Sequence, residues 1–135
     1  MPISNPYAAV VIFALAGILL SLAQILAFQL LVRHKFSILA EFKEENPAIG
    51  LVVAGQLISV GLVVHSTLLH NGSLVGVLAF GLLGIVLNLL AYLGLDWATP
   101  GWDLSQHIDR QSLAGGWAAW GAFIMVGLVV AGALG

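Results

Sequence analysis

The sequence contains no cysteine, and only 7% of its residues are charged. The absence of cysteine excludes disulfides, thiolate nucleophiles, iron–sulfur clusters and thiolate metal sites. The scarcity of charge excludes a soluble helical bundle, because each helix of such a bundle keeps one polar face toward water. With four basic and six acidic residues, the net charge of −2 provides no basic surface, so we expect no binding to nucleic acid.

The chain consists mainly of long apolar stretches. Hydrophobic residues make up 61% of it, and four long stretches carry no charged residue. Each stretch reaches the ~20 residues that an α-helix needs to cross a hydrocarbon core about 30 Å thick. A charge at the middle of such a helix costs about 2.5 to 3.5 kcal/mol, which explains why every charge lies outside them. The sequence therefore predicts an all-α membrane protein, a single transmembrane domain over residues 1–135 with four membrane-spanning helices at 7–32, 48–69, 74–95 and 113–134.

The two halves of the sequence also resemble each other. A shift of 66 positions places Gly50, Gly55 and Gly61 on Gly116, Gly121 and Gly127, with further identities between them. This spacing predicts an internal duplication, with repeat one at about 7–69 and repeat two at about 74–134. Because each unit holds two spans, the second unit enters the membrane from the same side as the first. The repeats are therefore expected to be parallel rather than inverted.

Orientation follows from the positive residues in the short loops, since Lys and Arg are retained on the cytoplasmic side of a membrane. The loop at 33–47 holds three of these residues, the loop at 95–112 holds one, and the opposite side holds none. We therefore expect both longer loops in the cytoplasm. Both termini and the tight Asn71-Gly72 turn are expected outside it.

Both longer loops carry a pattern typical of short amphipathic helices. Phe36, Leu39 and Phe42 recur at every third position, with charged residues between them, as in a helix that lies in the membrane interface. In the second loop Asp103 can cap a turn that places Leu104 and Ile108 on one face. The alternative is that both loops are solvated connectors. We favour interfacial helices.

Polar side chains gather on one side of the second span. At about 100° per residue, Gln56, Ser59 and Thr67 fall within one arc, and the first and third spans carry Gln24 and Asn88 in comparable stripes. A polar stripe in lipid is expected to face inward. One interpretation is interhelical hydrogen bonding, worth about 0.6 kcal/mol per bond. The other is a water-filled path, within the bundle or at a subunit seam.

Small residues form further faces of these spans, and small residues allow membrane helices to approach closely. The glycines repeat in both units and also occur in the third span. We expect helix packing at Gly50, Gly55, Gly61, Gly81, Gly84, Gly116, Gly121 and Gly127.

Residues that carry chemistry are sparse. His65 is the one histidine inside a span, and imidazole is a common metal or haem ligand. No other span supplies an opposing ligand, so His65 could serve only in a symmetric oligomer that brings two copies together. No serine has a carboxylate and a histidine in an evident triad order, and no glycine-rich loop precedes a helix. We therefore expect no catalytic residue, no metal, no cofactor and no enzyme activity.

The stretch Asn46-Pro47-Ala48-Ile49-Gly50, followed by Gly55 and Gly61, recurs loosely as Gln111-Ser112-Leu113-Ala114-Gly115-Gly116 with Gly121. Over nearly the whole chain, this pattern resembles the small bacterial membrane proteins grouped as domain of unknown function 350. The second copy departs from it, because Ser112 stands where the first has Asn46. The resemblance implies a multi-pass protein of the bacterial inner membrane, built from tandem two-helix units. It implies no settled activity, although some members accompany envelope-stress or phage-shock-type proteins.

Two functions follow from the sequence. The leading hypothesis is a scaffold or accessory subunit without chemistry of its own. It would lie among membrane lipids and use its glycine faces to form a homo-oligomer or to dock on a membrane complex. The alternative is an oligomeric pore or channel for water or ions, lined by Gln56, Ser59 and Thr67 of the second helix.

Overall fold

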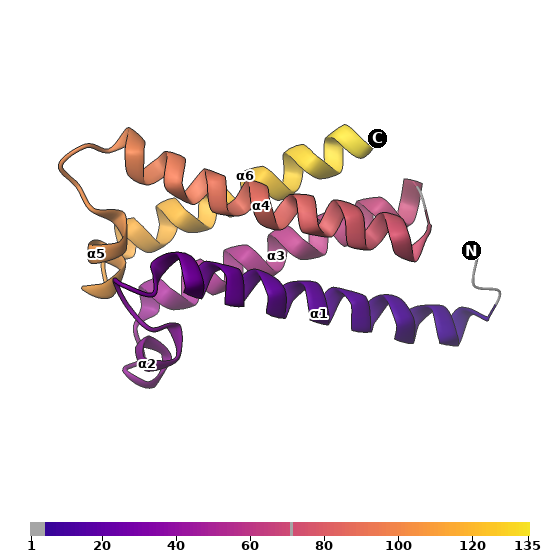
Figure 1. Ribbon diagram of the computed structural model, residues 1–135, viewed down its shortest axis with the longest axis horizontal. Helices are drawn as coiled ribbons and strands as arrows, with labels where there is room; N and C mark the ends of the chain where they lie inside the picture. Colours follow the sequence, from indigo (N-terminus) through magenta and orange to yellow (C-terminus); the bar gives the residue numbers. More distant parts are fainter. Residues whose placement is uncertain (1–4, 71) are drawn as a thin grey trace.

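The computed structural model describes residues 5–70 and 72–135, and these residues form helices joined by short connections without any strand. The helices are α1 (Pro6–Val32), α2 (Ile38–Lys43), α3 (Pro47–His70), α4 (Leu74–Ala98), α5 (Leu104–Asp109) and α6 (Leu113–Leu134) (Figure 1). Within the described residues, α1, α3, α4 and α6 are long and apolar enough to cross a membrane. The predicted all-α membrane fold is confirmed.

The helices begin where the sequence supplies caps. Ser37, Ser73 and Ser112 accept a backbone N–H in the first turns of α2, α4 and α6, and such caps satisfy donors that the helix itself leaves unpaired. Asp103 caps α5 in the same way, as its position in the sequence predicts. The third span extends beyond its predicted end at 95 to Ala98. The predicted turn at Asn71 lies outside the described residues.

The four long helices form two layers. In Figure 1 α1 and α4 lie in front of α3 and α6, and α1 begins at the end of the bundle where α6 finishes. The most extensive contact joins the parallel helices α3 and α6, and α4 packs against both of them as well as against α1. Helix α1 contacts α3 and α4 and is covered least, so most of its length faces the surroundings of the chain.

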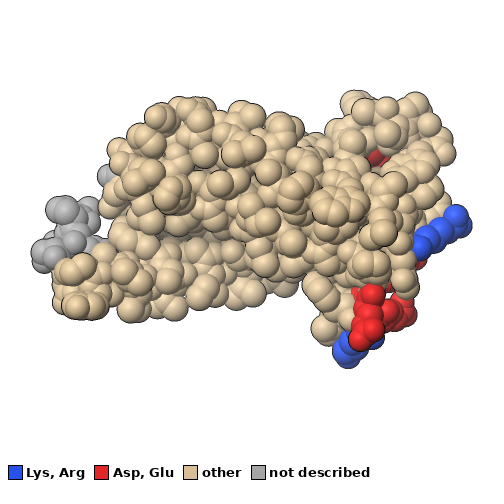
Figure 2. All heavy atoms as spheres, turned by 180° about the vertical axis from the view of Figure 1, so that it is seen from behind, with Lys and Arg blue, Asp and Glu red and all other residues tan. Residues whose placement is uncertain are grey.

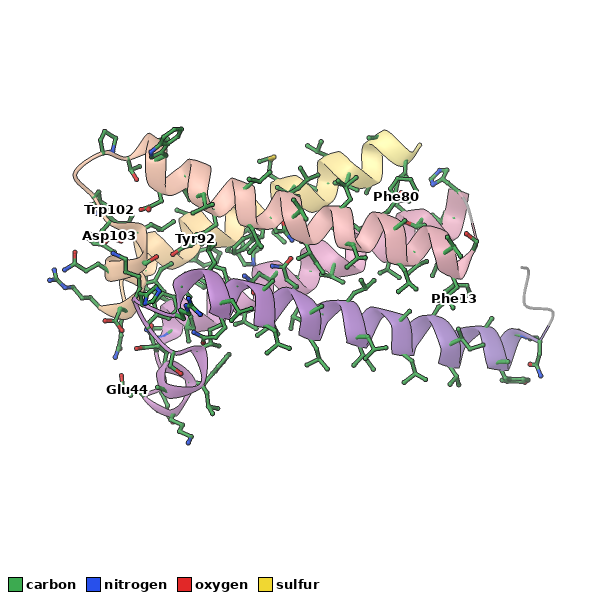
Figure 3. All side chains as sticks on the ribbon, in the orientation of Figure 1. Phe13, Glu44, Phe80, Tyr92, Trp102 and Asp103 are labelled. Atoms are coloured by element: carbon green, nitrogen blue, oxygen red, sulfur yellow. The ribbon has the colours of Figure 1, made fainter. Side chains whose placement is uncertain are left out.

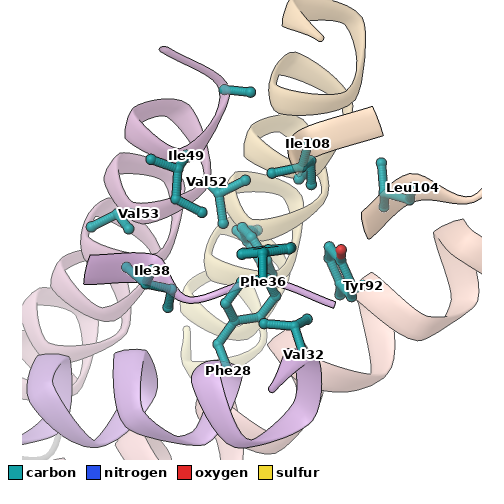
Figure 4. Close-up of a cluster of buried hydrophobic side chains, with 13 residues drawn as sticks. Phe28, Val32, Phe36, Ile38, Ile49, Val52, Val53, Tyr92, Leu104 and Ile108 are labelled. Carbon is teal, nitrogen blue, oxygen red and sulfur yellow. The ribbon is translucent and has the colours of Figure 1, made fainter. Parts of the chain in front are cut away.

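An aromatic core closes the end of the bundle that carries α2 and α5. Phe28 packs edge-to-face on Tyr92 and Phe123, at ring-centroid distances of 4.8 and 6.1 Å. Figure 4 shows aliphatic side chains of α3 and of both short helices around these rings. The charged residues gather at this same end, and Figure 2 shows the rest of one face free of charge. This separation is what a membrane demands of a polytopic protein.

The helix bounds repeat along the chain. Helix α5 begins and ends 66 residues after α2, α6 begins 66 residues after α3, and α4 ends 66 residues after α1. Two non-glycine residues with positive φ, Glu45 at 57° and Gln111 at 63°, are also 66 positions apart. Such backbone conformations are uncommon outside glycine. The offset supports the division into two units, which stays a prediction.

The two short helices differ in how they use their apolar residues. On α2, Leu39 and Phe42 are exposed, as expected for a helix that faces the membrane interface, whereas the preceding Phe36 is buried. On α5, Leu104 and Ile108 are fully buried against the bundle. The apolar face of α5 therefore closes the aromatic core instead of facing lipid, because α5 packs against α6, α3 and α4.

Candidate functional site

Glycines bring the backbones of α3 and α6 into direct contact. A Cβ atom added at Gly116 would lie 2.9 Å from Ala48 Cα, and one at Gly55 would lie 2.9 Å from Trp120 Cα. Further along the pair, Ser66 Oγ donates a hydrogen bond of 2.8 Å to the carbonyl oxygen of Ala131. Only glycine allows this approach, because real Cβ atoms do not come so close to backbone atoms.

Gly127 also lies against the α3 backbone, at Ser59, and the remaining predicted packing glycines fall into two groups. Gly81 packs on the Leu20 side chain of α1, and Gly84 lies 3.4 Å, measured from an ideal Cβ, from Val63 of α3. In contrast, a Cβ atom at Gly50, Gly61 or Gly121 would meet no other heavy atom within 4 Å. The structure thus uses part of the glycine pattern inside the chain and leaves these three positions without a neighbour.

A polar cluster joins α1, α3 and α4 inside the bundle. Ser59 Oγ donates to Asn88 Oδ1 at 3.2 Å, and Asn88 Nδ2 donates to Gln24 Oε1 at 2.9 Å. All three residues are at most 1% exposed. Thr67 is also buried, and its hydroxyl donates to the Val63 carbonyl of its own helix at 2.7 Å. The structure therefore brings most of the predicted polar stripe together as interhelical contacts.

Gln56 belongs to the same face, but its side-chain amide makes no hydrogen bond to any described residue. Among the described residues, the buried side-chain atoms that lack a hydrogen-bond partner are both amide atoms of Gln56 and the Nε2 atom of Gln24. Gln56 is 0% exposed, so it lies within the chain and not on its outer surface. A pore at an oligomer seam would need Gln56, Ser59 and Thr67 on that outer surface.

A polar junction holds the loops at the charged end, and sequence reasoning did not assign it. Asn46 Nδ2 donates to Glu41 Oε2 and to the Ile108 carbonyl oxygen, both at 2.8 Å. Asn46 Oδ1 accepts from the Ala48 backbone N–H at 2.9 Å, which caps the start of α3. One side chain therefore links α2, α3 and α5. Its place in the Asn-Pro-Ala pattern was the signal that could have identified it.

Charged residues of the two loops complete the junction. Burial raises the pKa of the Glu41 carboxyl, and the nearby Asp109 carboxyl raises it further. Lys35 Nζ lies 3.0 Å from Asp103 Oδ2, and this contact lowers the pKa of Asp103. Figure 3 places Asp103 and Trp102 beside Tyr92 at this end, where the Tyr92 hydroxyl is 2.6 Å from Ser105 Oγ.

An apolar groove of about 890 Å³ lies between α1 and the second half of α3. Gly17 and Gly61 stand on its two walls, and neither would place a Cβ atom within 4 Å of another heavy atom. His65 is exposed and lines the same groove. The described residues contain no group of three His, Cys, Asp or Glu that could hold a metal ion. The residues that line the groove are almost all apolar, so it is suited to apolar packing.

Comparison with known proteins gives the family. The model of the family described as Domain of Unknown Function (DUF350) matches residues 2–134. The UPF0719 transmembrane protein YshE of Bacillus subtilis (strain 168) is 23% identical over 91 residues, which cover 67% of this chain and 68% of that protein. No solved structure matches the chain. With almost its whole length matched, this small multi-pass membrane protein belongs to the DUF350 family.

Proposed function

We propose that the protein is a scaffold or accessory subunit of a membrane assembly, without chemistry of its own, that associates through the groove between α1 and α3. The groove is the observation that carries this proposal. It is lined almost wholly by apolar side chains, and Gly17 and Gly61 leave room on both of its walls. Small residues at a lipid-facing surface let a further helix approach closely, which is how membrane helices associate in the absence of a hydrophobic driving force.

The polar residues of the spans support a structural role. Ser59, Asn88 and Gln24 bond to one another inside the chain, so they hold its helices together and leave no polar stripe for a pore between subunits. The pore is therefore the weaker of the two hypotheses. We further propose that the protein lies in the bacterial inner membrane with both longer loops in the cytoplasm, as the distribution of Lys and Arg favours.

The test is the mass of the native assembly. The protein, purified from its membrane in a mild detergent, is expected to run as an oligomer or together with a second membrane protein. Native mass spectrometry measures this directly. A strictly monomeric protein that retains no partner at any detergent concentration that preserves its fold would refute the proposal. Conductance across planar bilayers that is lost in Gln56→Leu would favour the pore instead.

A further inference from the structure

Helix α3 packs into a site between α4 and α6, the two long helices of the second unit. We name this site the seat. Val63 of α3 is buried in a small cluster whose other members all come from α4 and α6. These members are Phe80, Leu87, Ala91, Val126, Val130 and Leu134. Helix α3 therefore lies between the two long helices of the second unit.

The first unit contains the same seat without an occupant. Subtracting 66 from each member of that cluster gives Ala14, Ser21, Ile25, Val60, Val64 and Leu68. Every one of these six residues lines the groove between α1 and α3. Figure 3 labels Phe80 at the occupied seat and Phe13 at the groove, both toward the end opposite the loops. The groove is thus the counterpart in the first unit of the site that holds α3 in the second.

Two glycines at equivalent positions, Gly127 in the seat and Gly61 in the groove, support this correspondence. Gly127 forms the bottom of the occupied seat and touches the backbone of Ser59, and its counterpart in the groove is Gly61. A Cβ atom at Gly61 would meet nothing within 4 Å, as expected for the same surface without its helix.

The complementary surface is also present, on α6. Gly55 and Ser59 of α3 lie against α6, and Val63 enters the seat. Shifting these three residues by 66 gives Gly121, Met125 and Val129. Met125 is 51% exposed and Val129 61% exposed, and Gly121 has no neighbour within 4 Å of an ideal Cβ. Helix α6 therefore carries the features with which α3 fills its seat, on a face that is left uncovered by the other described helices.

We propose that the groove between α1 and α3 binds α6 of a second copy of this chain, with Val129 of the partner copy against the half-buried Val64 and Leu68. This inference rests on the proposed scaffold function and identifies its partner. Because the two units are parallel, the same contact can form between copies that share one orientation in the membrane. The interface is head-to-tail, since each copy offers its groove to one neighbour and its α6 to another. Such contacts build rings when the rotation closes and filaments when it does not.

A second copy explains the groove better than a lipid chain does. An acyl chain would be served by any apolar surface, whereas this groove reproduces all six positions of a seat that is built for a helix of this sequence. The chain also exposes the matching helix face. The contact therefore continues the interface between α3 and α6 from one copy to the next.

The absence of cysteine makes the register directly testable. Two single-cysteine variants, Val64→Cys and Val129→Cys, carrying tags of different size, are co-expressed and oxidised in the membrane. The expected product is a disulfide-linked heterodimer. Neither variant alone is expected to form a homodimer, because the contact is not symmetric. Leu78→Cys replaces Val129→Cys as the control, since Leu78 lies at a similar depth on α4 and both it and its counterpart Ile12 are exposed.

A second variant keeps the proposal testable if the disulfide geometry is unfavourable. Gly61→Leu places a side chain in the groove where nothing lies within 4 Å, so the chain is expected to fold with the wild-type melting temperature but to lose the oligomer. Leu78→Phe is its control and should stay oligomeric. An oligomeric wild type that shows neither the specific heterodimer nor sensitivity to Gly61→Leu would overturn this inference and leave the scaffold proposal standing. A monomeric wild type without any partner would overturn both.

Discussion

Gly127 of α6 lies directly against Ser59 of α3, so that a Cβ atom at Gly127 would lie 2.9 Å from both Cα and Oγ of Ser59. The same serine donates a hydrogen bond to Asn88 of α4. Three helices are therefore fixed relative to one another around one small side chain. The contact also separates glycines that the fold requires from glycines that it leaves free.

Replacing these glycines should reveal the two groups. Gly127→Leu is expected to destabilise the chain by about 1 to 3 kcal/mol or more, because the new side chain collides with the backbone of α3. Gly132→Leu is the matched control, since Gly132 lies on the same helix without a close neighbour, and its melting temperature should stay near that of the wild type. Thermal unfolding in detergent, followed by helical circular dichroism, measures both. Equal losses in the two variants would contradict this assignment.

Gln56→Met should preserve or raise the melting temperature. Both amide atoms of Gln56 are buried without a partner, and a buried polar group without a hydrogen bond costs about 1 to 3 kcal/mol. Methionine has a similar length and no such cost. Gln24→Met serves as the comparison, because it removes the acceptor of Asn88 and should lower the melting temperature. A marked loss of stability in Gln56→Met would mean that its amide is bonded, as in a hydrated path through the bundle.

Asn46→Ala should be among the more harmful polar substitutions in the loops. It removes two donated hydrogen bonds and the cap on α3, so we expect a loss of about 1 to 3 kcal/mol in unfolding free energy. Ser112→Ala is the control, because Ser112 holds the equivalent position and accepts a single backbone hydrogen bond from Gly115. Its loss should be smaller. Chemical unfolding in detergent compares them, and a larger loss in Ser112→Ala would exclude the central role of Asn46.

The buried Glu41 carboxyl should make stability depend on pH in a defined direction. Its pKa in the folded protein is raised above the ordinary value of 4.5, so folding favours the protonated form. The contribution of Glu41 to stability is therefore most favourable below that value and falls as the pH rises through the raised pKa. Glu41→Gln should remove this fall and be more stable than the wild type at neutral pH.

Melting temperatures of the two proteins, measured from mildly acidic to neutral pH, test the prediction for Glu41. Glu45→Gln is the control, since it replaces an exposed carboxylate of the same loop. Parallel curves for wild type and Glu41→Gln would show that the burial of Glu41 carries no such effect.

The membrane fold could be predicted because it depends on local composition. Uncharged runs of sufficient length must form helices in lipid, since every backbone polar group needs an internal partner there. Helix α6 has the predicted bounds, α1 differs from prediction by one residue at its start, and α3 differs by one residue at each end. The role of Asn46 could not be derived in the same way, because its partners Glu41 and Ile108 meet only when α5 folds onto the bundle.

The glycine pattern illustrates the same limit within one motif. Gly61 and Gly127 have the same neighbours in sequence, yet one lies in an empty groove and the other against Ser59. Spacing along a helix fixes which residues share a face. It does not fix which face meets another helix, because that depends on the packing of all four helices together.

The sequence by itself determined that this chain forms four apolar helices in a membrane, that its charges lie at the helix ends, and that its family is DUF350. These properties follow from the cost of charge and of unpaired backbone in hydrocarbon, which each segment meets on its own. Only the tertiary structure decided that the polar stripe is enclosed, that Asn46 joins three helices, and that a groove stays open beside α1. Those outcomes depend on contacts between distant segments, which local composition does not specify.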